Sequence, residues 1–93
     1  MLLRKKNKKL AVIIPCMNEE STISAVIQQA KKLNPDSLIV VVNGSSDPTA
    51  EFARNEGAEV IEYKQPLGND VGRAIGAMHT VADIYLFLDG DLV

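Results

Sequence analysis

Tryptophan is absent from this 93-residue chain, aromatic residues make up only 4% of it, and Cys16 is its single cysteine. One cysteine excludes a disulfide framework and fits a reducing compartment. No apolar run approaches the ~20 residues that a membrane-spanning helix needs. With 46% hydrophobic and 24% charged residues, the composition suits one small packed domain and excludes a disordered or collagen-like chain. The length allows one core and is short for an enzyme that holds two substrates.

Basic residues are also scarce outside the first nine positions. Residues 1–9 carry five of the ten Lys and Arg residues, whereas residues 10–93 carry the other five and all twelve acids, which gives this part a charge of −7. A basic leader could contact anionic lipid or nucleic acid. We favour a solvated leader, because no aromatic residues alternate with the lysines and the acidic body would repel phosphates. We therefore expect a flexible tail over residues 1–9, one domain over residues 10–93 and no nucleic-acid partner.

The start of the chain is only superficially like a secretion signal. Its apolar run, residues 10–14, is cut by Pro15 and followed by Asn18, Glu19 and Glu20. A signal peptide needs roughly 7–15 apolar residues and a small-residue cleavage site. We therefore predict a cytoplasmic protein without a transmembrane segment.

Continuous apolar runs predict the strands of the fold. Residues 10–14, 38–42 and 84–88 are rich in β-branched or aromatic residues and end on polar or turn residues, a pattern typical of strands buried on both faces. Residues 59–63 alternate between polar and apolar and predict an edge strand.

Helical patterns lie between these strands. An amphipathic pattern spans residues 20–33, a second helix is predicted to be capped by Asp47, begin at Pro48 and close at Gly57, and a third runs from about residue 69 to 80. The order β-α-β-α-β-α-β predicts a mainly parallel sheet in a three-layer α/β/α, Rossmann-like fold. Ligands of such folds bind beyond the carboxyl ends of the strands. The candidate loops are residues 15–20, 43–47, 66–70 and 89–91.

The loop Asp89-Gly90-Asp91 follows the most aromatic strand. Two carboxylates one residue apart can converge on a hard cation, and the glycine between them lets the backbone approach a ligand. An ordinary Asp-Gly turn is the alternative interpretation. Two carboxylates do not complete an octahedral site, so a metal here would also need water or substrate phosphate.

The other loops offer fewer charged groups. In residues 43–49 we interpret Asp47 as a helix cap, with Asn43 and the serines available to bind a neutral group such as a base or ribose; a purely structural turn is the alternative. Residues 15–20 lack both the glycine-rich dinucleotide motif and the P-loop lysine. Cys16 has no His–Asp pair beside it in this loop, so we interpret it as a small buried side chain.

Glycines and one arginine distinguish the third predicted helix. Gly68, Gly72 and Gly76 recur every four residues, which indicates close packing on a sheet. Arg73 is one of only five basic residues in the body, and a bound diphosphate needs cationic partners. His79, near the end of this helix, is interpreted as a surface residue or as a partner of the helix dipole.

Together these motifs point to a known family. Residues 10–20, 41–49, 68–76 and 85–91 resemble, in order and spacing, the nucleotide-sugar-binding half of the family 2 glycosyltransferases, which have the GT-A fold. The resemblance covers nearly the whole chain from Leu10. Each motif alone is a weak indication of the family, but the four together, in the family's order and spacing, are a specific one. It implies the strand order 3-2-1-4 and transfer of a sugar from a nucleotide-diphosphate sugar to an acceptor.

The resemblance also assigns roles to residues. It implies that Pro15 and Glu19 contact the nucleoside, that Arg73 approaches the diphosphate, and that Asp89 and Asp91 form an Asp-x-Asp pair. The resemblance further implies that this pair contacts the donor and binds Mn²⁺ or Mg²⁺. With the strand order 3-2-1-4, the loops of Glu19 and Asp89–Asp91 should flank one crevice.

One position departs from the family pattern. Asn43 falls at the second acidic position of the family's Asp-Asp-Gly-Ser stretch, and Val42 occupies the first, where an aspartate often holds the base. The resemblance therefore implies a nucleotide at Asn43 without implying uridine.

Three functional hypotheses follow. In the family the general base and acceptor pocket lie after the Asp-x-Asp pair, so the expected base lies downstream of Val93 and the 93 residues are expected to be inactive alone. The alternative is a non-catalytic α/β module that self-associates through an exposed strand at residues 84–88. A sugar-phosphate nucleotidyltransferase is the weakest, because residues 15–20 lack the glycine-rich, basic first loop of that class.

Overall fold

Strands and helices alternate along the chain in the predicted order. In this computed structural model, residues 8–65 and 68–91 are described, and the predictions for residues 1–7, 66–67 and 92–93 lie outside the described residues. The strands are β1 (Leu10–Cys16), β2 (Ser37–Asn43), β3 (Glu59–Tyr63) and β4 (Ile84–Phe87); the helices are α1 (Ile23–Lys31), α2 (Thr49–Asn55) and α3 (Asn69–Met78). Each helix starts later or ends earlier than its sequence pattern suggested.

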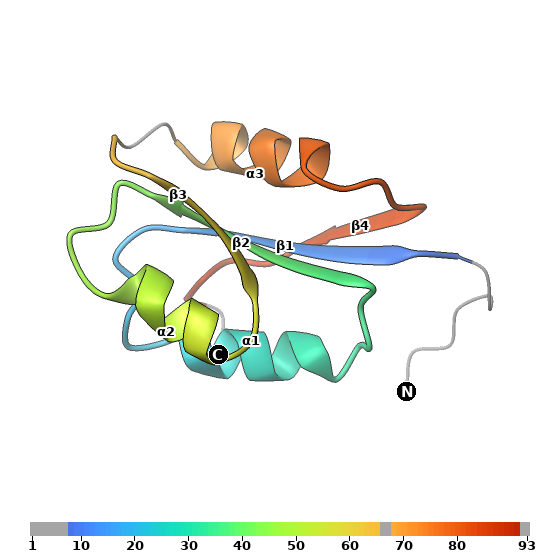
Figure 1. Cartoon of the computed structure of the whole chain (residues 1–93), viewed down its shortest axis with the longest axis horizontal. Coiled ribbons are helices and arrows are strands. Elements are labelled where there is room, and N and C mark those ends of the chain that lie inside the picture. The colour runs from blue at the N-terminus through green and yellow to red at the C-terminus, as the bar shows by residue number, and fades with distance from the viewer. Residues whose placement is uncertain (1–7, 66–67, 92–93) are drawn as a thin grey trace.

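The strands form one parallel sheet in the order β3-β2-β1-β4. Helices α1 and α2 cover one face of this sheet and α3 covers the other (Figure 1). The three-layer architecture and the strand order 3-2-1-4 are therefore confirmed. The strand order reverses at β1, because β2 and β3 follow on one side of it and β4 lies on the other, and the carboxyl ends of all four parallel strands lie at the same edge of the sheet.

The hydrophobic core lies on both sides of β1 and β2. Every residue of β1 is buried, as is β2 from Ile39 onward. Because successive side chains of a strand point to opposite faces, Val12 and Ile14 pack in the larger core cluster with α1, whereas Ile13 packs with Ile75 of α3. The continuous apolar runs thus correctly predicted strands that are covered on both faces.

Strand β4 is the exception. The residues of its run were predicted to be buried on both faces, but Ile84, Tyr85 and Phe87 are 43%, 37% and 39% exposed, so this prediction is wrong. The reason is position: β4 pairs with β1 at the end of the described sheet, and α3 contacts β1 and β2. The same exposure agrees with the separate expectation that residues 84–88 form an apolar edge.

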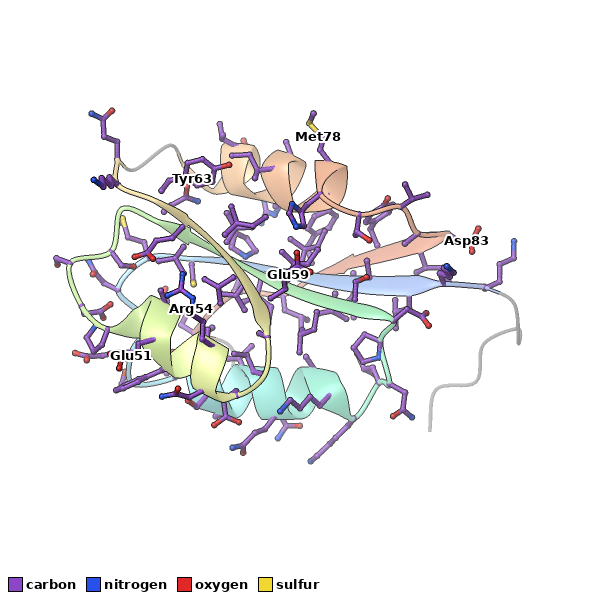
Figure 2. All side chains as sticks on the ribbon, viewed as in Figure 1. Glu51, Arg54, Glu59, Tyr63, Met78 and Asp83 are labelled. Carbon is purple, nitrogen blue, oxygen red and sulfur yellow. The ribbon has the colours of Figure 1, made fainter. Side chains whose placement is uncertain are left out.

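Helix α3 approaches the sheet closely through two glycines. A Cβ added at Gly76 would lie 2.4 Å from Ile13 Cγ2, and one at Gly72 would lie 2.6 Å from Asn43 Nδ2. Gly68 has a different role, because nothing would contact its Cβ and its φ of +88° favours glycine. The predicted packing stripe therefore holds for two of the three glycines. Met78 ends the helix and points away from the sheet (Figure 2).

Several polar contacts fasten the amino ends of the strands. Asp36 accepts a hydrogen bond from the Leu10 N–H at 2.7 Å, and Asp83 accepts one from the Lys9 N–H at 2.8 Å. His79 follows α3 and contacts the carboxylate of Glu59 on β3, which confirms its interpretation as a surface residue. Within residues 8–65 and 68–91, no helix has the length and apolarity required to span a bilayer.

Candidate functional site

A crevice of about 330 Å³ opens at the carboxyl ends of β1 and β4. Its lining comes from the loop after β1 and the loop after β4: Pro15, Cys16, Met17, Glu19, Asp89, Gly90 and Asp91. Four of the six predicted site residues, Pro15, Glu19, Asp89 and Asp91, are thus brought together. The expectation that these two loops flank one crevice is confirmed.

The pairing of β4 with β1 places the Asp89–Asp91 loop. The Leu88 N–H donates to the Ile13 carbonyl at 3.0 Å, so the chain leaves the sheet directly beside the end of β1. The next turn comes so close that a Cβ at Gly90 would lie 2.5 Å from Cys16 Cβ and 3.0 Å from Glu19 Cγ. Thr22 fixes this turn by donating its hydroxyl to the Gly90 carbonyl at 2.8 Å. Glycine between the two aspartates is therefore a steric requirement of the site.

The crevice concentrates negative charge. Partial burial raises the pKa of Glu19 above its ordinary value, and the carboxylates of Asp91, Asp47 and Asp89 raise it further. This effect requires the four acidic side chains to lie near one another. Burial, with help from Glu19 and Asp47, also raises the pKa of Cys16 to about 12, which leaves a protonated, weakly nucleophilic thiol. The prediction of Cys16 as a small buried side chain is confirmed.

The donor atoms of this crevice fit a hard divalent cation. Carboxylate oxygens are ligands that Mg²⁺ and Mn²⁺ prefer, and a cation would relieve the repulsion among these acids. Among residues 8–65 and 68–91, no group of three His, Cys, Asp or Glu side chains is arranged to hold a metal by itself. Asp89 and Asp91 would thus leave most coordination positions to water or to a ligand's phosphates.

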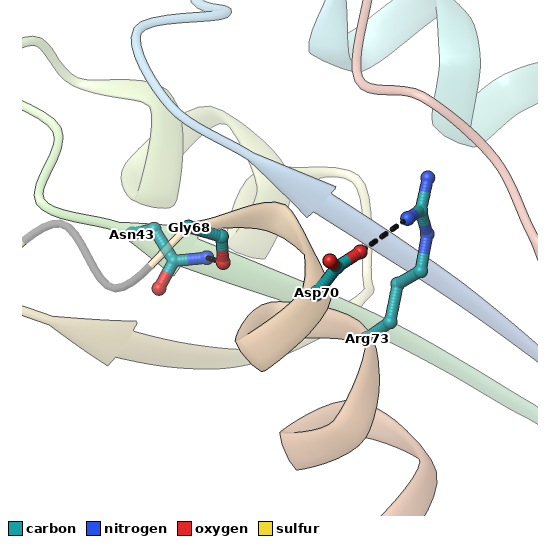
Figure 3. A network of polar contacts seen from close by, with 4 residues as sticks. All are labelled: Asn43, Gly68, Asp70 and Arg73. Atoms are coloured by element: carbon teal, nitrogen blue, oxygen red, sulfur yellow. Dashed lines mark hydrogen bonds and ion pairs between the residues drawn. The ribbon is translucent and has the colours of Figure 1, made fainter.

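Asn43 lies outside the residues that line the crevice. It ends β2 and is 2% exposed beneath the first turns of α3, where its Nδ2 donates to the Gly68 carbonyl at 3.5 Å (Figure 3). Its Oδ1 is buried without a hydrogen-bond partner among the described residues. A buried unpaired acceptor is costly, so a hydrogen-bond donor that reached this atom would stabilise it. Pro15 connects the two places, since a Cβ at Gly72 would lie 3.2 Å from Pro15 Cβ.

Arg73 is also outside the crevice lining. Its guanidinium lies on α3 and contacts the Asp70 carboxylate at 3.1 Å (Figure 3). Asp70 is 99% exposed and Arg73 is 41% exposed, so the pair is a weak surface contact that an anion can displace. Arg73 therefore lies one turn into α3, the helix that begins beside Asn43.

The serines of the second loop have partners that the sequence did not reveal. Ser45 and Ser46 hydrogen-bond to Asn18 of the first loop, which favours the structural-turn interpretation of these serines over the base- or ribose-binding one. Helix α2 begins at Thr49 with Pro48 as its N-cap residue, one residue later than predicted. Asp47 still satisfies the first N–H of the helix, because its carboxylate accepts the Thr49 N–H, and it also accepts the Glu20 N–H of the first loop.

The structural neighbours define the class of fold. The chain superposes with a TM-score of 0.80 and 33% identity on the crystal structure of glucosyl-3-phosphoglycerate synthase from Mycobacterium tuberculosis with Mn²⁺, uridine diphosphate and glucosyl-3-phosphoglycerate, covering 94% of this chain and 35% of that one. A structure of the same enzyme with uridine diphosphate alone also gives a TM-score of 0.80. The fold is thus the GT-A, Rossmann-like fold of a nucleotide-sugar-dependent glycosyltransferase.

The family model for Glycosyl transferase family 2 matches residues 11–93, and the chain belongs to this family. It is 44% identical over 86 residues to protein RfbJ of Shigella flexneri, covering 88% of this chain and 64% of that protein. It is 35% identical over 101 aligned positions to glucosyl-3-phosphoglycerate synthase of Mycobacterium tuberculosis H37Rv, covering 96% and 31%. The chain spans less than two thirds of the length of these relatives.

Proposed function

We propose that this chain is the donor-binding portion of a glycosyltransferase that uses a nucleotide-diphosphate sugar. One observation carries the proposal: the pairing of β4 with β1 brings Asp89 and Asp91 into one crevice with Glu19 and Pro15. Membership of family 2, and a similar structure that holds Mn²⁺ and uridine diphosphate, support this use of the crevice.

Asp89 and Asp91 would hold the divalent cation, Mn²⁺ or Mg²⁺. When bound, the cation supplies Lewis-acid neutralisation of the charge on a nucleoside diphosphate. The chain itself would position the donor. Pro15 and Glu19 line the part of the crevice that would face the nucleoside, and the close turn at Gly90 fixes the spacing of the two aspartates. Without a cation the acidic crevice would repel the diphosphate.

Arg73 and Asn43 would extend the donor site toward α3. Arg73 is half-buried and contacts only an exposed acid in the described structure, so its guanidinium can exchange Asp70 for a diphosphate oxygen. The unpaired Oδ1 of Asn43 can accept a hydrogen bond from the nucleotide. The assigned residues all serve the donor and none serves an acceptor, so we expect the 93 residues to bind the donor without transferring its sugar.

Calorimetric titration tests this function directly. We expect uridine diphosphate to bind in the presence of Mn²⁺ and binding to be lost with EDTA, because the diphosphate enters an acidic crevice only with a cation. Titrations with guanosine and thymidine diphosphates, and with Mg²⁺, would define the base and the metal. No heat with any of these nucleotides at millimolar concentration, with either metal, would contradict the proposal.

A second role, self-association through β4, is supported by the exposed apolar residues of that strand. In the described structure β4 pairs along one side with β1, and its other side leaves backbone N–H and C=O groups for a further strand. Two copies related by a two-fold axis would pair β4 with β4 antiparallel. Tyr85 and Phe87 of the two copies would then cover each other on the face occupied by α3.

Sedimentation velocity over a range of concentrations tests this association. We expect a monomer–dimer equilibrium in the wild-type protein and a shift to monomer in Phe87→Lys, because a charge on the edge strand opposes pairing. Phe52→Lys is the matched control, since Phe52 is 37% exposed on α2, away from β4. A wild-type protein that stays monomeric at the highest concentration would rule out the association.

A further inference from the structure

The first loop is held in place by side chains of the second loop. The Glu19 N–H donates to Thr49 Oγ1 at 2.9 Å, and the Glu20 N–H donates to Asp47 Oδ2 at 3.3 Å. Thr49 is fully buried, and its hydroxyl donates in turn to Asp47 Oδ1, which also accepts the Thr49 N–H at 3.1 Å. Asp47 and Thr49 therefore form a relay that ends on two consecutive main-chain donors of the first loop.

Asn18 adds a second connection between the same loops. Its φ of 55° is in the left-handed region, which asparagine tolerates better than most residues. In this conformation its N–H donates to Ser45 Oγ at 2.8 Å, and its Oδ1 accepts the Ser46 N–H at 2.9 Å. Three consecutive main-chain donors, those of residues 18–20, thus end on side chains of residues 45–49, and none of these second-loop residues lines the crevice.

The relay fixes the residue that faces the aspartates. On one side the Glu19 N–H is bound to Thr49, and on the other the Glu19 carbonyl accepts the Thr22 and Ile23 N–H groups at 3.0 and 2.9 Å. With both main-chain groups bound, the Glu19 side chain is directed at the Gly90 turn, where a Cβ would lie 3.0 Å from its Cγ. A small rotation of this residue would open the wall of the crevice or fill it.

We propose that Asp47 and Thr49 are positioning residues of the donor site, which hold the main chain of Glu19 and Glu20 so that the crevice keeps the shape that accepts a metal-bound nucleoside diphosphate. The inference rests on the proposed function for its ligand and on the hydrogen bonds above for its mechanism. Asp47 and Thr49 act through the main chain of the first loop and do not line the crevice themselves.

The ionisation state of Asp47 agrees with this role. Burial alone would raise the pKa of Asp47, but the hydrogen bonds from the Thr49 hydroxyl and N–H and from the Glu20 N–H outweigh it and lower the pKa. Asp47 is therefore an ionised acceptor at neutral pH, and hydrogen bonds to an ionised acceptor are stronger than neutral ones. The Thr49 hydroxyl donates to this carboxylate and accepts the Glu19 N–H, so each of these two hydrogen bonds strengthens the other.

Thr49→Val separates the relay from simple packing, because valine keeps the shape of threonine and removes its hydroxyl. Thr49→Ser keeps the hydroxyl, and Thr80→Val removes a hydroxyl that contacts Ser37 near the opposite ends of the strands. Two measurements are made on the four proteins: hydrogen exchange of the Glu19 amide by NMR, and calorimetric affinity for uridine diphosphate with Mn²⁺. Thermal unfolding shows that each variant is folded.

We expect Thr49→Val to lose protection of the Glu19 amide and to weaken binding about tenfold, as for loss of an outer hydrogen-bond partner of a metal site. Thr49→Ser should restore both, and Thr80→Val should change neither. A protected Glu19 amide or wild-type affinity in Thr49→Val would overturn the positioning role. A wild type without affinity would overturn the proposed donor binding and the role in it, while amide exchange would still decide whether Thr49 holds Glu19.

Discussion

Asp91→Asn is expected to abolish Mn²⁺-dependent nucleotide binding while leaving the fold unchanged. The substitution removes one of the two carboxylates proposed to hold the cation and keeps the size of the side chain. We expect a loss of affinity on the order of 100-fold or more, because loss of even an outer partner of a metal ligand typically costs 10–100-fold. Calorimetry with uridine diphosphate and Mn²⁺ measures it. Because Asp91 is exposed, the free energy of unfolding of the Asp91→Asn protein should stay within about 0.5 kcal/mol of the wild-type value.

Glu51→Gln is the matched control for this experiment. Glu51 is an exposed carboxylate in the first turn of α2 (Figure 2) that does not line the crevice, and the change removes the same single charge. Equal weakening in both variants would mean that overall charge, and not a metal at Asp91, sets the affinity. Asp91→Asn also separates the two proposed functions, because it should abolish nucleotide binding and leave association through β4 unchanged.

Gly76→Val is expected to cause the largest loss of stability in the chain. The first atom of any side chain at this position already lies 2.4 Å from Ile13 Cγ2 and 3.2 Å from Val41 Cγ2, and Ile13 and Val41 are fully buried in the sheet. Neither neighbour can move aside, so α3 must lift from the sheet. We expect the free energy of unfolding to fall by about 3 kcal/mol or more, at the upper end of the cost of overpacking a core. Urea denaturation measures it.

Ala74→Val controls for the intrinsic cost of valine in a helix. Ala74 is exposed on the same helix, where a β-branched residue costs about 0.5 kcal/mol through side-chain entropy alone. If Gly76→Val were no more destabilising than Ala74→Val, the close approach of α3 to Ile13 would not exist. A large difference between the two would show that glycine at position 76 is required by packing.

The parts of the fold that the sequence predicted well depend on local patterns with strong physical causes. Residues 10–14 and 38–42 are continuous apolar runs rich in β-branched residues, and such runs become central parallel strands because both faces must be covered. Residues 59–63 alternate and form the edge strand β3. Helix ends were predicted less well: the pattern from residue 20 begins as a helix only at Ile23, after a turn in which the Glu19 carbonyl accepts the Thr22 and Ile23 N–H groups.

The candidate site divides in the same way. The loops 15–20 and 89–91 were placed together by strand order, and the crevice contains their predicted residues. Asn43, which ends β2, and Arg73, in the first turns of α3, lie outside the crevice lining. The serines of the second loop bind Asn18. No local signal reveals these partners, because Asn18 and Ser46 are 28 residues apart in sequence and meet only when β1 and β2 pair.

The sequence by itself determined that this chain is a parallel α/β domain with a basic leader, an acidic body and an Asp-Gly-Asp loop at a strand end. These properties follow from composition, hydrophobic period and residue order, which are local. Only the tertiary structure decided that Thr22 holds the turn at Gly90 and that Asp47 and Thr49 hold the main chain of Glu19 and Glu20. Each of these depends on contacts between segments far apart in the chain, which form when the strands take their order in the sheet.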